Sequence, residues 1–360
     1  MLRKILKTGR LKAWSVYKDE LRKRHDLTYL FWECTLRCNF FCKHCGSNAG
    51  NKVFQNELTT AEIKKCLKEI AEDFDAKKIM LAITGGEPLI RNDVFEVMDC
   101  AHKLGFPWGM VTNGFLVNER IVEQMKEAGM KTIVVSIDGI GKTHDDFRGI
   151  NGAYKKAINV VKLLAQANFL DDLQITTTIH KSNIGELEEM YRTFLPLGIH
   201  SWRVFGVDPI GRAENNKELL LDDRELKTVL DFIKEKRKRS KKIDITFGCE
   251  GFLGLNYEGE LRNHYFYCNT GINTGSILYN GDIFVCPNVP RRPELIQGNI
   301  RKDRFSKVWN EKFEIFRNPK RTSCKECLEC SYWNECLGGS FHLWNFEKNQ
   351  PKICHLKILE

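Results

Sequence analysis

The sequence lacks any apolar run of the length that a secretory signal peptide or a membrane-spanning helix requires. It begins Met-Leu-Arg-Lys-Ile-Leu-Lys, where basic residues interrupt each short apolar stretch. Fourteen cysteines would suggest disulfide bonds in a secreted protein, but no signal peptide is recognisable. We therefore expect a cytoplasmic protein with reduced thiols and no membrane partner.

The sequence also lacks a motif that reads nucleic acid, although its formal net charge is +9. Basic clusters such as residues 22–24 and 234–242 are typical of solvated helix ends, so we do not expect a nucleic-acid partner. A hydrophobic content of 42% over 360 residues is enough for one large domain with a smaller one beside it.

Strand-like and helix-like segments alternate through the first two thirds of the chain. Short runs rich in β-branched and aromatic residues predict six strands, at 28–36, 78–84, 108–112, 132–137, 173–180 and 201–207. The segments between them predict helices, the first of which begins near Thr60, with Thr59 and Glu62 spaced as a capping box. This alternation predicts an α/β fold, a partial (β/α)6 TIM-like barrel whose site lies at the carboxyl ends of the strands.

Composition divides the chain into three predicted regions. Residues 1–26 predict a basic N-terminal arm, which is too short to recognise a peptide by itself, and residues 27–242 predict the barrel. From residue 243 short strands and turns prevail, and seven of the fourteen cysteines lie between Cys268 and Cys354. We predict that residues 243–360 form a small cysteine-rich domain.

Three cysteines lie within eight residues just after the first predicted strand. Cys38, Cys42 and Cys45 have the spacing C-x3-C-x2-C. Three thiolates from one loop can ligate an iron–sulfur cluster, and a [4Fe–4S] cluster then keeps one iron without a protein ligand. The stretch Gly85-Gly86-Glu87-Pro88 ends the second strand, where glycines allow a ligand near the backbone and the glutamate presents a carboxylate.

This loop and this turn closely resemble those of the radical S-adenosylmethionine (SAM) enzymes. The resemblance implies that the three cysteines hold a catalytic [4Fe–4S] cluster, whose fourth iron is chelated by the amino and carboxyl groups of SAM. It also implies SAM contacts at the same rim: Glu87 with the backbone of Gly85 and Gly86 at the methionyl ammonium, Ser136 and Arg148 at the ribose and carboxylate, and His44 against the adenine. Asn113 is a further candidate, or it only shapes a turn.

The cysteine-rich end resembles the SPASM domain, which in its full form holds two auxiliary [4Fe–4S] clusters. The resemblance assigns the outer cluster to Cys327, Cys330, Cys336 and Cys354, and the inner one to Cys268 and Cys286. Ser340 stands where the family has a further cysteine. Cys249 or Cys324 could replace that ligand, or one iron could stay open or bind oxygen. Zinc is the alternative for C-x2-C spacing.

The resemblance implies that SAM is cleaved reductively to a 5′-deoxyadenosyl radical, which abstracts hydrogen from a substrate. Enzymes with this domain commonly crosslink or epimerise peptides or proteins, so we expect a ribosomally made precursor peptide. A flavodoxin- or ferredoxin-type electron donor and a separate peptide-recognition protein are the further expected partners. A sulfatase-maturing activity ranks lower because Pro287 stands where that branch has its aspartate base. A non-catalytic electron-transfer protein is the remaining alternative.

Overall fold

The computed structural model describes residues 2–52, 54–320 and 322–359. Residues 1 and 360, the outer limits of the predicted N-terminal arm and cysteine-rich domain, lie outside the described residues. Its main sheet has the strand order β10-β9-β8-β1-β2-β3-β4-β5-β6-β7. The first seven strands run parallel: β1 (Tyr29–Thr35), β2 (Met80–Gly85), β3 (Trp108–Thr112), β4 (Thr132–Ser136), β5 (Asp172–Ile179), β6 (Ser201–Gly206) and β7 (Asp244–Phe247). The six predicted strands and the partial barrel are confirmed.

The sheet continues beyond β1 into the cysteine-rich part of the chain. There β8 (Thr274–Ile277) pairs in parallel with β1, and β9 (Asp282–Phe284) and β10 (Gly298–Asn299) follow in antiparallel order. A small separate sheet joins β11 (Trp344–Asn345) to β12 (Gln350–Pro351). Strand β7 also begins after the boundary predicted near residue 243, so both sides of that boundary contribute strands to one sheet.

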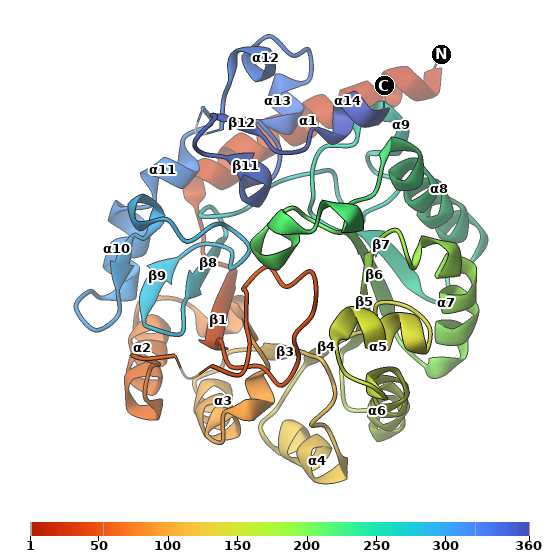
Figure 1. The fold of residues 1–360 in the computed structure, drawn as a ribbon. Coiled ribbons are helices and arrows are strands. Elements are labelled where there is room, and N and C mark those ends of the chain that lie inside the picture. The colour runs from red at the N-terminus through yellow and green to blue at the C-terminus, as the bar shows by residue number, and fades with distance from the viewer. Residues whose placement is uncertain (1, 53, 321, 360) are drawn as a thin grey trace.

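Helices form a ring outside the strands (Figure 1): α2 (Thr60–Asp73), α3 (Val94–Lys103), α4 (Glu119–Glu127), α6 (Ala153–Ala167), α7 (Leu187–Phe194) and α8 (Asp223–Arg239). The capping box of Thr59 and Glu62 starts α2 as predicted. The prediction did not include α5 (Lys142–Arg148). The shorter helices follow later: α9 (Gly254–Tyr257), α10 (Phe305–Glu311), α11 (Glu314–Arg317), α12 (Lys325–Leu328), α13 (Trp333–Cys336) and α14 (His355–Leu359).

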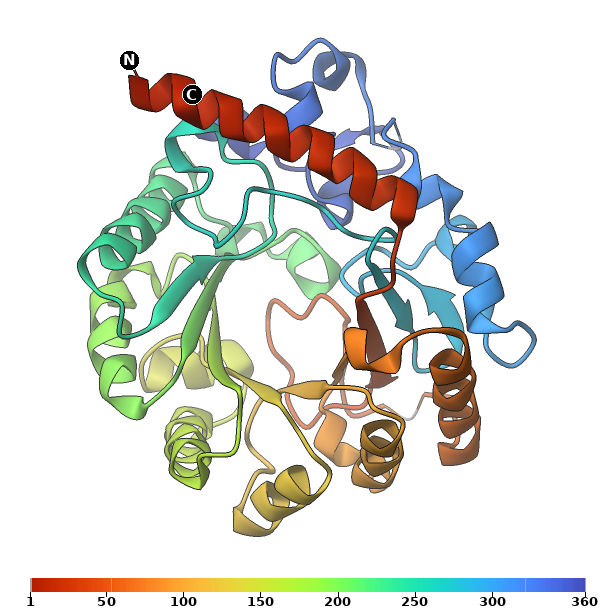
Figure 2. The ribbon, with the colours of Figure 1, turned by 180° about the vertical axis from the view of Figure 1, so that it is seen from behind.

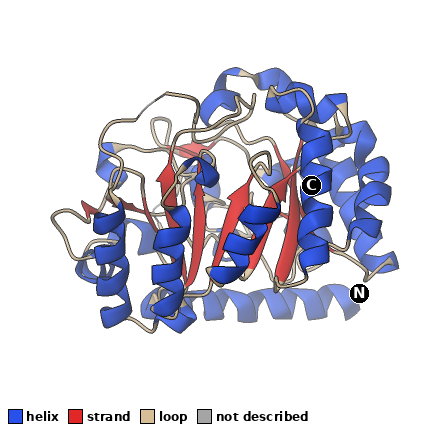
Figure 3. Ribbon diagram, turned by 90° about the horizontal axis from the view of Figure 1, so that it is seen from below, coloured by secondary structure: helices blue, strands red, loops and turns tan. Residues whose placement is uncertain are grey.

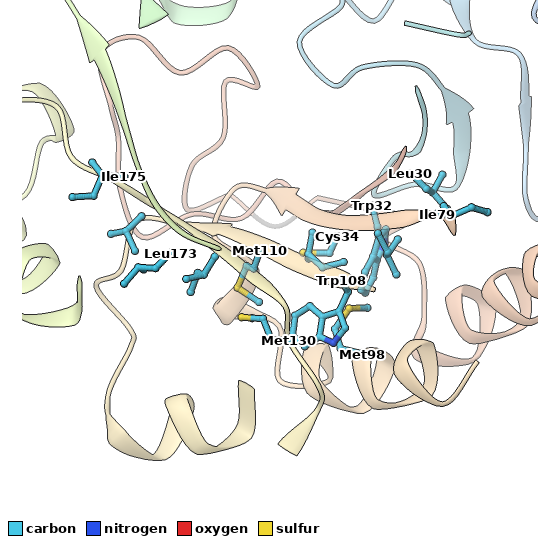
Figure 4. Close-up of a cluster of buried hydrophobic side chains, with 14 of the residues drawn as sticks. Leu30, Trp32, Cys34, Ile79, Met98, Trp108, Met110, Met130, Leu173 and Ile175 are labelled. Carbon is cyan, nitrogen blue, oxygen red and sulfur yellow. The ribbon is translucent and has the colours of Figure 1, made fainter. Parts of the chain in front are cut away.

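The main core lies between the strands and their outer helices. Trp32 of β1 and Trp108 of β3 are completely buried there, together with Cys34 (Figure 4). Because β-strand side chains alternate between two faces, the other face of each strand points into the barrel. The carboxyl ends of the parallel strands meet at the barrel mouth, so the polar residues there surround one opening.

Helix α1 (Leu2–Arg24) crosses the back of the barrel, on the side opposite the strand arrowheads (Figures 2 and 3). It is anchored by Lys18, whose buried ammonium donates hydrogen bonds to the carbonyls of Asn334 at 3.1 Å and Glu335 at 2.6 Å. In the described ranges, no helix combines the length and the apolar character needed to cross a membrane.

We expect Lys18 to make the stability of the fold depend on pH. Burial lowers the pKa of Lys18 to about 8, so the unfolded chain binds this proton more tightly than the folded one. The free energy of unfolding should therefore rise between about pH 8 and about pH 10, and Lys18→Met should lose this rise. Urea unfolding at both pH values measures it. Lys12→Met, at an exposed position of α1, should follow the wild type; a constant gap between wild type and Lys18→Met would contradict the expectation.

Candidate active site

The cysteine loop between β1 and α2 lies at the mouth of the barrel, where it is held by its own backbone and by Arg212. Cys38 donates its backbone N–H to the carbonyl of Gly50 at 2.8 Å. The Arg212 guanidinium donates to the carbonyls of Cys42 and Ala49, both at 2.7 Å. One arginine thus ties the second cysteine to the segment that follows the third, a role that the sequence analysis missed.

The three thiols of this loop line a single cavity of about 290 Å³. Each sulfur has a nearby donor: the N–H of Phe40 lies 3.4 Å from Cys38 Sγ, that of Ala49 3.4 Å from Cys45 Sγ, and Arg148 Nη1 3.7 Å from Cys42 Sγ. Burial raises the pKa of the Cys38 thiol to about 12, so the metal-free thiol is protonated. Three thiols with backbone or guanidinium donors around one cavity fit an anionic iron–sulfur cluster.

Two glycines lock this loop onto the end of β2. Gly86 donates its N–H to the carbonyl of Thr35 at 2.7 Å, and Glu87 donates to that of Arg37 at 2.9 Å. A Cβ on Gly85 would lie 2.1 Å from the Thr35 carbonyl oxygen, and one on Gly86 2.0 Å from that of Arg37. Glycine is therefore required here because the cysteine loop packs directly on the turn.

Most of the predicted SAM contacts line the same cavity as the three thiols. They are His44, Gly85, Gly86, Asn113, Ser136 and Arg148. The His44 ring stacks on Phe147 with 4.4 Å between ring centroids, and Phe147 in turn stacks on His180. Burial lowers the pKa of His44 to about 3, so the ring is neutral and suits packing against a flat ligand.

Glu87 departs from the predicted arrangement, because it is not among the residues that line the cavity. Its completely buried carboxylate accepts hydrogen bonds from the Thr112 hydroxyl and the Asn113 N–H, both at 2.8 Å. Burial raises the pKa of Glu87 to about 7. The carboxylate thus joins the carboxyl ends of β2 and β3, and the backbone of the turn, rather than this side chain, faces the cavity.

We expect Glu87→Ala to lower both stability and SAM affinity, because it leaves the buried Thr112 and Asn113 donors without an acceptor. Each such loss costs about 1–3 kcal/mol, and Glu87→Gln should lose less because it keeps one acceptor. Urea unfolding and equilibrium dialysis with SAM measure the two effects. Glu96→Ala, at an exposed position of α3, is the control. A loss of affinity at unchanged stability would instead indicate the direct contact predicted from the sequence.

A buried ion pair at the end of β4 faces the second cysteine. Arg148 Nε donates to Asp138 Oδ2 at 2.6 Å, and the Thr178 N–H donates to Asp138 Oδ1 at 2.8 Å. Burial opposes the charge of Asp138, but Arg148 together with His44, His144 and the Thr178 N–H outweighs burial and lowers the pKa of this carboxyl. Arg148 comes from α5, so this short helix carries the guanidinium from the chain after β4 into the cavity.

The cavity also has lining residues that the sequence analysis missed, among them Asp208, which follows β6. Its position at a strand end was the available signal, since the same rule found Ser136 at the end of β4. A second cavity of about 410 Å³ shares Gly46, Ser47, Ile210 and Asn288 with the first, so the two are continuous. Pro287 lines this second cavity.

The cysteines of the C-terminal part form two groups. Five of them line an outer cavity of about 590 Å³: Cys324, Cys327, Cys330, Cys336 and Cys354. Because Cys324 lines this cavity, it lies with the outer set. Of the two unassigned cysteines, only Cys249 is near Cys268 and Cys286. As placed, the described His, Cys, Asp and Glu side chains form no group of three or more that would hold a single metal ion.

Comparison with known proteins agrees with this arrangement. The model of the radical SAM superfamily matches residues 32–194, and that of SPASM, an iron–sulfur cluster-binding domain, matches residues 268–331. The chain belongs to the radical SAM superfamily and carries a SPASM domain. It is therefore a radical SAM enzyme that uses SAM and a [4Fe–4S] cluster, and its SPASM domain implies auxiliary iron–sulfur clusters rather than zinc.

Relatives with different activities share this architecture. The AdoMet-dependent heme synthase of Methanosarcina barkeri is 32% identical over 323 residues, which cover 85% of this chain and 89% of that protein. The PqqA peptide cyclase of Rhizobium meliloti is 26% identical over 283 residues, or 78% and 72% of the two chains. Streptococcus suis SuiB bound to SAM has a similar fold, with a TM-score of 0.73 at 18% identity over 94% of this chain and 79% of that one.

Proposed function

We propose that this enzyme abstracts a hydrogen atom from a peptide or protein substrate that reaches the SAM cavity through the second cavity. Cys38, Cys42 and Cys45 would hold the catalytic cluster, and the backbone at Gly85 and Gly86 would contact SAM. Bound SAM and the reduced cluster supply a 5′-deoxyadenosyl radical. The Arg148 guanidinium keeps one donor on Cys42 and stands at the SAM cavity, where it can bind a carboxylate.

The observation that carries the peptide proposal is the charge balance of the second cavity. Each of its three lining cations pairs with a carboxylate: Arg291 with Glu33, Arg292 with Glu294, and Lys352 with Glu214. The remaining lining includes asparagine amides and the aromatic rings of Trp344 and Phe346. Amides and aromatic rings suit a peptide backbone and apolar side chains better than a substrate with several negative charges.

The likeness to the PqqA peptide cyclase supports this substrate class. The sulfatase-maturing activity, which converts a sulfatase cysteine or serine to formylglycine, gains no support, because Pro287 lines the second cavity without offering a proton acceptor. The second candidate is an iron porphyrin. It is favoured by the 32% identity to the heme synthase, which exceeds the 26% identity to the peptide cyclase. To bind in the second cavity through its carboxylates, a porphyrin would have to displace the glutamates that pair with the arginines and the lysine of its lining.

The two candidates are distinguished by the substrate that stimulates SAM cleavage. The full chain is reconstituted anaerobically, and 5′-deoxyadenosine is measured with SAM and dithionite, which stands in for the proposed flavodoxin- or ferredoxin-type donor. Parallel reactions contain Fe-coproporphyrin III, or synthetic peptides encoded by short reading frames next to the gene. Stimulation and a mass change with a peptide would support the proposal. Turnover of the porphyrin alone would establish the second candidate instead.

A further inference from the structure

Three cysteines from three different loops meet behind the SAM cavity. Cys249 follows β7, Cys268 precedes β8 and Cys286 follows β9. One short segment, residues 340–342, contacts Cys249, Cys268 and the nearby Asp208. The charge effects agree with this grouping: burial and then the Cys268 thiolate raise the pKa of Cys249 to about 11, and burial and then the Cys249 thiolate raise that of Cys286. Cys249 is nevertheless exposed, so its thiol is not closed off by the surrounding side chains.

Ser340 occupies the position of the expected fourth ligand, but its hydroxyl is engaged elsewhere. Its Oγ donates a hydrogen bond to the backbone carbonyl of Cys249, and its side chain is buried. The following N–H, that of Phe341, lies 3.4 Å from Cys268 Sγ. This segment therefore positions two of the three cysteines through main-chain contacts.

Asp208 is a ligand-type side chain that lies near these cysteines and also lines the SAM cavity. Its negative charge raises the pKa of both Cys249 and Cys286. His342 Nε2 lies 3.1 Å from Asp208 Oδ2. Burial opposes a charge on His342, but Asp208, with smaller effects of Cys268 and Glu250, raises the pKa of this histidine. Carboxylates that ligate metals are commonly held by such a hydrogen-bonding partner.

We propose that Cys249, Cys268 and Cys286 hold the inner auxiliary cluster, and that Asp208, oriented by His342, supplies its fourth ligand in place of Ser340. Ser340 is then a positioning residue for the Cys249 loop. Since Asp208 lines the SAM cavity, an iron that it ligates would be reachable from that cavity. A carboxylate is a harder and weaker ligand for iron than a thiolate, so this position is the one open to exchange.

Iron analysis and Mössbauer spectroscopy of the anaerobically reconstituted full chain test this ligand set. Three [4Fe–4S] clusters give about twelve irons per chain, and Cys249→Ala should lose about four of them. In the wild type and in the matched control Ser340→Ala, two irons should differ from the all-thiolate sites: the open iron of the catalytic cluster and the iron bound by Asp208. Asp208→Cys should convert the second of these to the signature of the all-thiolate sites and leave the first unchanged.

The decisive comparison is between Asp208→Cys and Ser340→Ala, which does not depend on whether Cys249→Ala folds. Loss of the second distinct iron in Ser340→Ala, with its persistence in Asp208→Cys, would assign the ligand to Ser340 and overturn the proposal. A wild type with no distinct iron beyond that of the catalytic cluster, or an unchanged iron content in folded Cys249→Ala, would overturn it as well. These readouts are spectroscopic and do not involve the substrate, so the proposed substrate class stands or fails separately.

Discussion

Cys42→Ala should reduce the formation of 5′-deoxyadenosine from SAM below detection and remove about four of about twelve irons per chain. Cys42 is the buried central thiol of the C-x3-C-x2-C loop, and its sulfur lies 3.7 Å from the Arg148 guanidinium. With only two thiols left, two of the four irons would have no protein ligand: the one reserved for SAM and the one that Cys42 ligates. Anaerobic product analysis and iron determination on the same preparation measure both effects.

A matched control separates loss of the cluster from loss of a core side chain. Cys66 of α2 is as buried as Cys42, at 3% and 7% exposure, but packs among apolar residues of the main core. Cys66→Ala should therefore keep both the iron content and the activity of the wild type. Product formation by Cys42→Ala would contradict the assignment of this loop as the catalytic cluster site. A loss of all iron would show that the auxiliary clusters depend on it.

The predicted site residues that the structure places around one cavity were found from short-range patterns. The three cysteines of one loop line one cavity because their spacing alone brings them together. Ser136 and Gly85 reach the same cavity because parallel strands present their carboxyl ends at one edge of the sheet. Short runs of β-branched and aromatic residues, separated by turn residues, were enough to find these strands. The barrel and its mouth could therefore be predicted from local sequence.

The parts that the sequence left open depend on contacts between distant segments. The Glu87 carboxylate turns toward Thr112 and Asn113 on the neighbouring strand end, which no spacing within its own turn reveals. Cys324 and Cys249 were equivalent candidates in the sequence, and only the path of the chain places the first at the outer cavity and the second beside Cys268. Helix α5 was missed because seven residues are too few for a clear helical period.

Arg148→Ala should destabilise the protein by about 3–5 kcal/mol, because it leaves the carboxylate of Asp138 charged and unpaired in the interior. Asp138 is completely buried, and Arg148 Nε is 2.6 Å from its Oδ2. The same substitution removes a guanidinium from the lining of the SAM cavity, so SAM affinity should fall as well. Urea unfolding and equilibrium dialysis with SAM measure these effects, with Arg120→Ala at an exposed position of α4 as the control.

The pH dependence of this variant identifies the unpaired carboxylate as the cause. Arg148 holds the pKa of Asp138 below its ordinary value, and without Arg148 burial should raise it. Asp138 then takes up a proton as the pH falls, so the stability deficit of Arg148→Ala should shrink between about pH 7 and about pH 5. Adding Asp138→Asn to the variant should recover part of the stability at neutral pH but none of the lost SAM affinity. If the double variant is no more stable than Arg148→Ala, the guanidinium contributes through packing rather than through its charge.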